Sequence, residues 1–147
     1  MDTVAGSIMT AELPIPKGFR AYREPSPFLD RIGPIYERDD EAGLVFGLLV
    51  LEHHCNRRGI AHGGLLTTLA DVALGKTAEW RSTPPARLIT TAIAYDFMGI
   101  AKQGEWIEAK SDFHRIGKEL AFANCYVRVG DRVIGRANGQ YKVAPER

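Results

Sequence analysis

The chain has 147 residues, of which 45% are hydrophobic and 25% are charged, so its composition excludes a disordered or fibrous chain and predicts one globular domain. Its 19 basic and 18 acidic residues leave a net charge of +1, which excludes the broad positive field that attracts nucleic acid or an anionic membrane. The longest apolar run, residues 44–51, is far shorter than the roughly 20 residues of a membrane-spanning helix. Because the chain starts without a secretory signal pattern and has only 2 cysteines, we expect it to be cytoplasmic.

The start of the chain predicts an N-terminal arm followed by a single domain. Residues 1–26 contain several prolines and little periodicity, so we expect an arm there and the domain over residues 27–147. The domain is expected to open with one helical turn at residues 28–32, which Gly33-Pro34 stops.

Two strands are predicted next. Residues 35–38 favour a short strand, and residues 39–43 favour a turn after it. The near-continuous apolar run of residues 44–53 contains Gly47 and is flanked by turn signals, so a strand covered on both faces is preferred over a helix.

The longest helix is predicted over residues 63–81. Apolar side chains recur there at helical spacing, and Pro84-Pro85 closes the segment. The residues expected on its buried side are Leu66, Leu69, Ala70, Ala73 and Leu74.

The remainder of the chain predicts strands joined by tight, glycine-containing turns. The expected strands are residues 87–97, 105–114, 119–129 and 132–143. Gly130-Asp131 resembles the two-residue loop of a hairpin. The expected fold class is therefore α+β, with one long helix against a curved antiparallel sheet of five to six strands.

The chemistry of the sequence gathers around the start of the long helix. The pair Gly63-Gly64 exposes backbone N–H groups at the positive end of that helix, where an oxyanion would be stabilised. Small and polar residues form one stripe of the helix: Gly64, Thr67, Thr68, Asp71, Gly75 and Ala78. A carboxylate on such a stripe can be approached closely, and together with oxyanion donors it predicts acyl-transfer chemistry.

An ordered set of residues carries a resemblance to a known family. The set comprises Asn56, His62-Gly63-Gly64, Asp71, Tyr95-Asp96-Phe97-Met98 and Ala101-Lys102-Gln103-Gly104. Over about residues 35–143 it resembles the hotdog-fold acyl-CoA thioesterases of the phenylacetic-acid-degradation (PaaI) type. The resemblance implies hydrolysis of a CoA thioester to a free acid and CoA, with coenzyme A as part of the substrate and with no separate cofactor or metal. It also implies dimers joined sheet edge to sheet edge, homotetramers built from two dimers, and active sites shared between subunits.

The resemblance also implies roles for three residues at the helix. The Gly63 N–H would hold the oxyanion, and His62 would help to shape that site. Asp71, from the other subunit, would act as general base towards water or would attack directly as the nucleophile.

Further roles follow from the same resemblance. Asn56 would orient the attacking water or the thioester. Thr90 would position water beside the carboxylate, with Thr91 as the alternative if the strand register differs by one residue. The candidate contacts for the CoA phosphates are Arg57, Arg58, Arg115 and Lys118.

Each of these residues also has a plainer interpretation. Asn56 could hold its own turn, His62 could cap the helix, and Asp71 could simply face water. Thr90 could be an ordinary strand residue and the basic residues could be solvated turn charges. The chain also has Ile100 where many relatives have proline, and the directions of Arg87 and Asp96 leave the acyl specificity open.

The sequence offers residues for four other functions. A metal site from His53, His54, Cys55, His62 and His114 is disfavoured because no paired ligand spacing occurs. A cysteine nucleophile lacks a demonstrable basic or helix N-terminal setting. A hotdog acyl-CoA dehydratase or hydratase and a non-catalytic acyl-CoA-binding domain remain the alternatives to a thioesterase.

Overall fold

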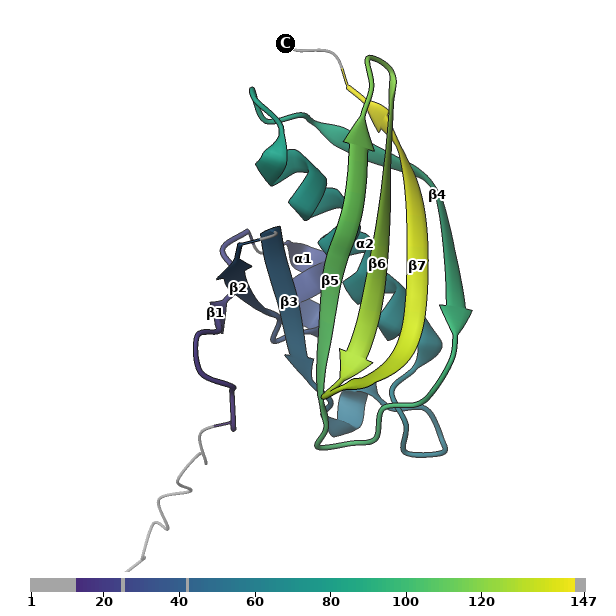
Figure 1. Cartoon of the computed structure of the whole chain (residues 1–147). Coiled ribbons are helices and arrows are strands. Elements are labelled where there is room, and N and C mark those ends of the chain that lie inside the picture. The colour runs from purple at the N-terminus through teal and green to yellow at the C-terminus, as the bar shows by residue number, and fades with distance from the viewer. Residues whose placement is uncertain (1–12, 25, 42, 145–147) are drawn as a thin grey trace, which may run out of the picture.

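The computed structural model describes residues 13–24, 26–41 and 43–144. Figure 1 shows one long helix, α2 (Gly63–Arg81), lying across the hollow side of a curved sheet. In the described ranges the sheet has seven strands in the order β1-β2-β3-β5-β6-β7-β4, and all neighbours are antiparallel. The strands are β1 (Arg20–Ala21), β2 (Tyr36–Asp40), β3 (Gly43–Leu49), β4 (Leu88–Phe97), β5 (Trp106–Ile116), β6 (Leu120–Val129) and β7 (Arg132–Val143). The predicted α+β architecture is confirmed, although the expected strand number was too low.

The additional strand lies in the expected N-terminal arm, of which residues 1–12 fall outside the described residues. β1 pairs with β2, and the Tyr22 ring packs edge-on against Phe46 with 5.5 Å between centroids. Arg20 and Arg23 both form ion pairs with the buried carboxylate of Glu37. The described part of the arm is therefore attached to the sheet. The sequence did not reveal this attachment, because a two-residue strand and its ion pairs leave no periodic signal. The division into arm and domain remains a prediction.

The predicted helices are both present. α1 (Pro27–Ile32) begins at Ser26, whose hydroxyl oxygen accepts a hydrogen bond from the Leu29 N–H at 3.3 Å. α2 has the predicted bounds, and the residues predicted for its inner side are all buried. No helix in the described part of the chain combines the length and apolar character needed to cross a membrane.

Near the end of α2, one residue of the predicted accessible stripe is buried instead. Ala78, which was assigned to the accessible stripe, is fully buried, as is Thr77. Thr77 lies against Gly43 at the start of β3, where a Cβ on the glycine would come within 2.8 Å of the threonine methyl. The start of β3 thus contacts the helix near its end.

β3 explains the long apolar run. All seven of its residues are buried, because α2 covers one face and aromatic side chains cover the other. The Trp106 ring lies directly over Gly47, with Phe19 and Tyr36 beside it. The strand ends at Leu49, earlier than predicted.

The turn after β3 is stabilised by a hydrogen bond between a histidine side chain and the backbone. A 3-10 turn at Glu52–His54 brings the His54 ring back, and its Nδ1 accepts a hydrogen bond from the Leu51 N–H at 2.9 Å. β6 and β7 are joined by Gly130-Asp131, as predicted, with Gly130 at φ +56.

Candidate active site

The backbone N–H groups at the start of α2 differ in their hydrogen bonding. His62 caps the helix, and its Nδ1 accepts a hydrogen bond from the Gly64 N–H at 2.9 Å. The His62 carbonyl accepts from Leu65 and Leu66. The Gly63 N–H has no hydrogen-bond partner among the residues that the structure describes. It therefore remains available to an oxyanion at the positive end of the helix.

His54 fixes the position of this helix start. Its carbonyl oxygen accepts a hydrogen bond from the His62 N–H at 2.9 Å, and its ring Nε2 lies 2.7 Å from the Ile32 carbonyl oxygen. Burial, and secondarily the neighbouring His53, lower the pKa of His54. The neutral ring then donates from Nε2 while Nδ1 accepts, so His54 links α1 to the entry of α2.

Asn56 holds the loop that leads into the helix. Its Oδ1 accepts a hydrogen bond from the Arg58 N–H at 2.9 Å, and its backbone bonds to Ile60 and Gly59. For the amide oxygen, the structure therefore agrees with the plainer interpretation, in which Asn56 is a turn residue bonded to its own loop. The Asn56 Nδ2 has no partner in the described ranges, so the amide can still donate to a ligand.

Asp71 is held by two hydroxyl groups from different strands. Thr90 on β4 donates to Asp71 Oδ1 at 3.0 Å, and the buried Tyr141 hydroxyl on β7 donates to the same oxygen at 3.4 Å. Thr91 instead donates to the Gln140 carbonyl at 3.0 Å, so the register places Thr90, and not its neighbour, beside the carboxylate.

Tyr141 is the residue of this group that sequence reasoning missed. It lies 70 positions from Asp71 in a strand with ordinary alternation. Burial, with the Asp71 charge as a smaller cause, holds the pKa of Tyr141 well above its usual value. The alternation of inward and outward side chains in residues 132–143 could show that Tyr141 faces the core. It does not identify which helix residue that side chain contacts.

One chain does not bring the two halves of the predicted site together. Asn56, His62 and Gly63 lie at the helix start, whereas Asp71 and Thr90 lie further along the helix. Asp71 follows Gly63 by eight residues, which corresponds to about 12 Å along the axis. A carbonyl within hydrogen-bond reach of the Gly63 N–H is therefore beyond the reach of Asp71 in the same chain.

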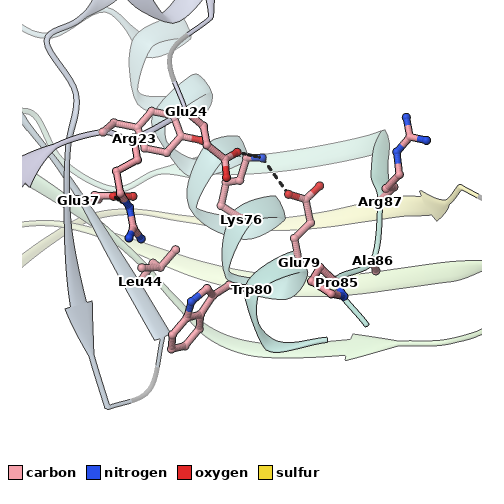
Figure 2. Close-up of a pocket in the computed structure, with 11 residues that line it drawn as sticks. Arg23, Glu24, Glu37, Leu44, Lys76, Glu79, Trp80, Pro85, Ala86 and Arg87 are labelled. Atoms are coloured by element: carbon pink, nitrogen blue, oxygen red, sulfur yellow. Dashed lines mark hydrogen bonds and ion pairs between the residues drawn. The ribbon is translucent and has the colours of Figure 1, made fainter. Parts of the chain in front are cut away.

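Asp71 lines a pocket of about 220 Å³ that adjoins a larger one. Its apolar lining includes Leu29, Val72 and Leu88. The larger pocket, of about 490 Å³, shares three residues with the first: Tyr22, Lys76 and Glu79. The other residues that line the larger pocket and are labelled in Figure 2 are Arg23, Glu24, Glu37, Leu44, Trp80, Pro85, Ala86 and Arg87. The two adjoining pockets form a groove along α2 that is divided by the residues they share.

Ion pairs border this groove where its two pockets meet. Lys76 Nζ lies 2.6 Å from a carboxylate oxygen of Glu24 and 2.9 Å from one of Glu79 (Figure 2). Arg87, whose direction the sequence left open, lines the groove, whereas Asp96 faces away and pairs with Arg136 at 2.7 Å. Both pockets therefore combine apolar side chains with the charged pair of Lys76 and Glu79.

A second groove, of about 370 Å³, adjoins the helix start. Its lining comes from α1, the 3-10 turn and α2: Phe28, Arg31, Ile32, His53, His54, His62, Gly64, Leu65 and Thr68. Each half of the predicted site is therefore bordered by its own groove.

The four candidate phosphate contacts are not gathered in one place. Arg57 and Arg58 are exposed on the loop before α2, whose start lies at the lower end of the molecule in Figure 1. Arg115 and Lys118 are exposed at the turn between β5 and β6, at the upper end. Within one chain they do not form a single anion site.

The other chemistries find little support in the geometry. In the part of the chain that the structure describes, no three His, Cys, Asp or Glu side chains are grouped as metal ligands. Cys125 is buried, and burial raises the pKa of its thiol to about 12. Cys55 is half-buried, with its thiol 3.5 Å from the Leu51 carbonyl oxygen. The raised pKa keeps the Cys125 thiol protonated, which disfavours it as a nucleophile.

Comparisons with known proteins agree with the fold. The profile of the "Thioesterase superfamily" matches residues 58–137. A Pseudomonas aeruginosa protein named "Putative esterase" is 39% identical over 128 residues, which are 86% of this chain and 96% of that protein.

Two solved structures share the fold at low identity. The phenylacetic acid degradation protein PaaI of Thermus thermophilus, as a point mutant, superimposes with a TM-score of 0.69 at 20% identity, over 81% of this chain and 100% of that one. A Bacillus halodurans protein solved with CoA superimposes with a TM-score of 0.67 at 18% identity, over 76% of this chain and 74% of that one. These likenesses confirm the predicted hotdog fold.

Proposed function

Because the chain belongs to the thioesterase superfamily and is a thioester hydrolase, we propose that its substrate is an acyl-CoA, which it hydrolyses to a free acid and CoA. The observation that carries the proposal is the combination of a Gly63 N–H that has no partner among the described residues with a carboxylate, Asp71, held by two hydroxyl donors. Coenzyme A as the thiol is supported by the Bacillus halodurans structure of the same fold, which was solved with CoA. A cytoplasmic location remains a prediction.

The active site is proposed to form between two copies of the chain. The two halves lie too far apart in one chain to act on one carbonyl. β4 is the last strand of the described sheet and spans 10 residues, so one edge of it is left without a strand partner. Natural proteins rarely leave so long an edge open, and a two-fold pairing of β4 with itself would close it. Assembly of such dimers into a homotetramer remains a prediction.

In this proposal the thioester carbonyl oxygen accepts a hydrogen bond from the Gly63 N–H of one subunit. Asp71 of the partner subunit takes a proton from water, and the water oxygen attacks the carbonyl carbon. Collapse of the tetrahedral intermediate breaks the C–S bond, and the leaving thiolate takes up a proton to give CoA. In the alternative route Asp71 itself attacks, expels the thiolate and forms a mixed anhydride, which water then hydrolyses.

The remaining candidates fit around this reaction. Asn56 would orient the water or the thioester through its Nδ2, and His62 would border the oxyanion. Arg57 and Arg58 would contact the CoA phosphates near the second groove, which adjoins the start of α2. Arg115 and Lys118 could reach the same CoA only across a subunit boundary.

The acyl group is proposed to occupy the groove that begins at Asp71. The pocket beside Asp71, of about 220 Å³, has room for a short acyl chain. A long chain would extend beyond it and would remove water from the ion pairs of Lys76 with Glu24 and Glu79. That desolvation is unfavourable, so acyl length should be limited.

Hydrolysis of a panel of acyl-CoAs tests both the function and this groove. With thiol release as the readout, hexanoyl-CoA is expected to show a kcat/KM about tenfold or more above that of palmitoyl-CoA, which corresponds to about 1.4 kcal/mol. Equal values for the two substrates would assign the acyl chain to another groove. Tight binding of every acyl-CoA without thiol release would favour a binding domain instead, and hydration of enoyl-CoAs would favour a hydratase.

A further inference from the structure

We propose that Tyr141 is a positioning residue that, together with Thr90, holds one oxygen of Asp71 and leaves the other, Oδ2, as the oxygen that reacts. This inference rests on the proposed hydrolysis and adds to it a residue and a reacting atom.

The contacts of the carboxylate are unequal. The hydroxyl groups of Thr90 and Tyr141 both donate to Asp71 Oδ1, at 3.0 and 3.4 Å, and they arrive from two strands that are paired with each other. Asp71 Oδ2 has no hydrogen-bond partner in the described ranges. A carboxylate held in this way keeps its plane fixed and presents Oδ2 with its lone pairs unused.

Tyr141 is well suited to hold a carboxylate in place. The residue is 2% exposed, and the backbone packs closely around its ring. A Cβ at Gly139 would lie 2.8 Å from the Tyr141 hydroxyl oxygen, and one at Gly75 would lie 3.5 Å from the ring. Glycine at position 139 therefore leaves the space that the hydroxyl occupies, and the ring has little freedom to turn away from Asp71.

The protonation of Tyr141 agrees with a donor role. Burial, and secondarily the Asp71 charge, raise the pKa of Tyr141 and keep it protonated throughout the neutral range, so its hydroxyl donates whenever the carboxylate is charged. The other titratable groups around the pair are Tyr22, Lys76 and Glu79 in the pocket and Cys125 beside the Tyr141 ring. Replacement of Tyr141 by phenylalanine leaves all of these in place.

The test compares Tyr141→Phe with wild type by measuring kcat and KM across a pH series, with an acyl-CoA that the wild-type protein hydrolyses. We expect kcat to fall about tenfold and KM to stay within about twofold, as for loss of one hydrogen bond to a charged group. The acidic limb of the pH profile should move to higher pH, because a carboxylate that has lost a donor is protonated more readily.

Tyr95→Phe is the matched control. The Tyr95 hydroxyl on β4 is also buried, but it has no hydrogen-bond partner in the described residues. Its removal should change neither kcat nor the pH profile. If Tyr141→Phe retains the wild-type kcat and acidic limb, the proposed role of Tyr141 is wrong. Absence of hydrolysis by the wild-type protein would instead remove the proposed function, and this inference with it.

A second pair of variants covers the case in which Tyr141→Phe does not fold. Thr90→Val removes the other donor to Oδ1 and should lower kcat and move the acidic limb in the same direction. Thr90→Ser keeps the hydroxyl and should restore both. If Thr90→Val and Thr90→Ser share one pH profile, the assignment of Oδ1 as the held oxygen is wrong.

Discussion

Replacement of Asp71 by asparagine is expected to lower kcat by about 100-fold to 10,000-fold, the range of a general base, with little change in KM. Asparagine has the same shape, and its Oδ1 can still accept hydrogen bonds from Thr90 and Tyr141. It cannot take a proton from water or form an anhydride, so either proposed route is stopped. The measurement is thiol release under saturating acyl-CoA.

Asp96→Asn is the control for this variant. Asp96 lies on β4, the strand that carries Thr90, but it faces away from α2 and pairs with Arg136 in solvent. An exposed ion pair contributes little to stability, so this variant should retain wild-type activity. If Asp71→Asn stayed within about threefold of wild type, Asp71 would be neither base nor nucleophile.

Replacement of Gly63 by proline is expected to lower kcat by about 100-fold to 1,000-fold, the usual loss for one oxyanion donor. Proline has no N–H, yet it is well tolerated in the first turn of a helix. His62 has φ −63 and ψ 137, which is the backbone conformation favoured before proline. The variant therefore removes the proposed donor while the start of α2 is preserved, which circular dichroism and the melting temperature can verify.

Gly63→Ala separates the missing N–H from the added bulk. A Cβ at this position would come within 3.0 Å of the Phe97 ring, which is exposed and able to shift. The alanine variant carries the same added carbon and keeps the N–H, so it should remain within a few-fold of wild type. Equal activities of the proline and alanine variants would contradict the role of the Gly63 N–H.

The elements of the fold were largely predictable because local signals agree with the final environment. The helix over residues 63–81 has a glycine-rich start and a proline stop. β6 shows strict alternation of exposed and buried residues, which matches a strand with one face on the core. These signals depend on neighbours in sequence, and a single sequence contains them fully.

Features that depend on distant partners could not be predicted in the same way. β1 exists only because β2 offers an edge to Arg20–Ala21. Thr77 is buried where the end of α2 lies against Gly43 at the start of β3. Neither contact alters the local pattern of the residues involved.

The residues of the candidate site also divide into those that local sequence predicts and those that depend on distant partners. Gly63 and His62 were recognisable because a helix start creates unpaired N–H groups wherever it occurs. The placement of Thr90 rather than Thr91 beside Asp71 depends on the register of β4 against β7, including the irregularity between Thr90 and Ala92. Tyr141 depends on the same pairing, and so its contact with Asp71 required the structure.

The central claim is that each active site combines Gly63 of one subunit with Asp71 of the other. Gly63→Pro and Asp71→Asn chains, carrying different affinity tags, can be expressed together and the mixed dimers isolated through both tags. In a two-fold symmetric dimer the mixed species contains one intact site and one doubly impaired site, so it should recover about half of the wild-type activity. Mixed dimers as inactive as either parent variant would contradict a site shared between subunits.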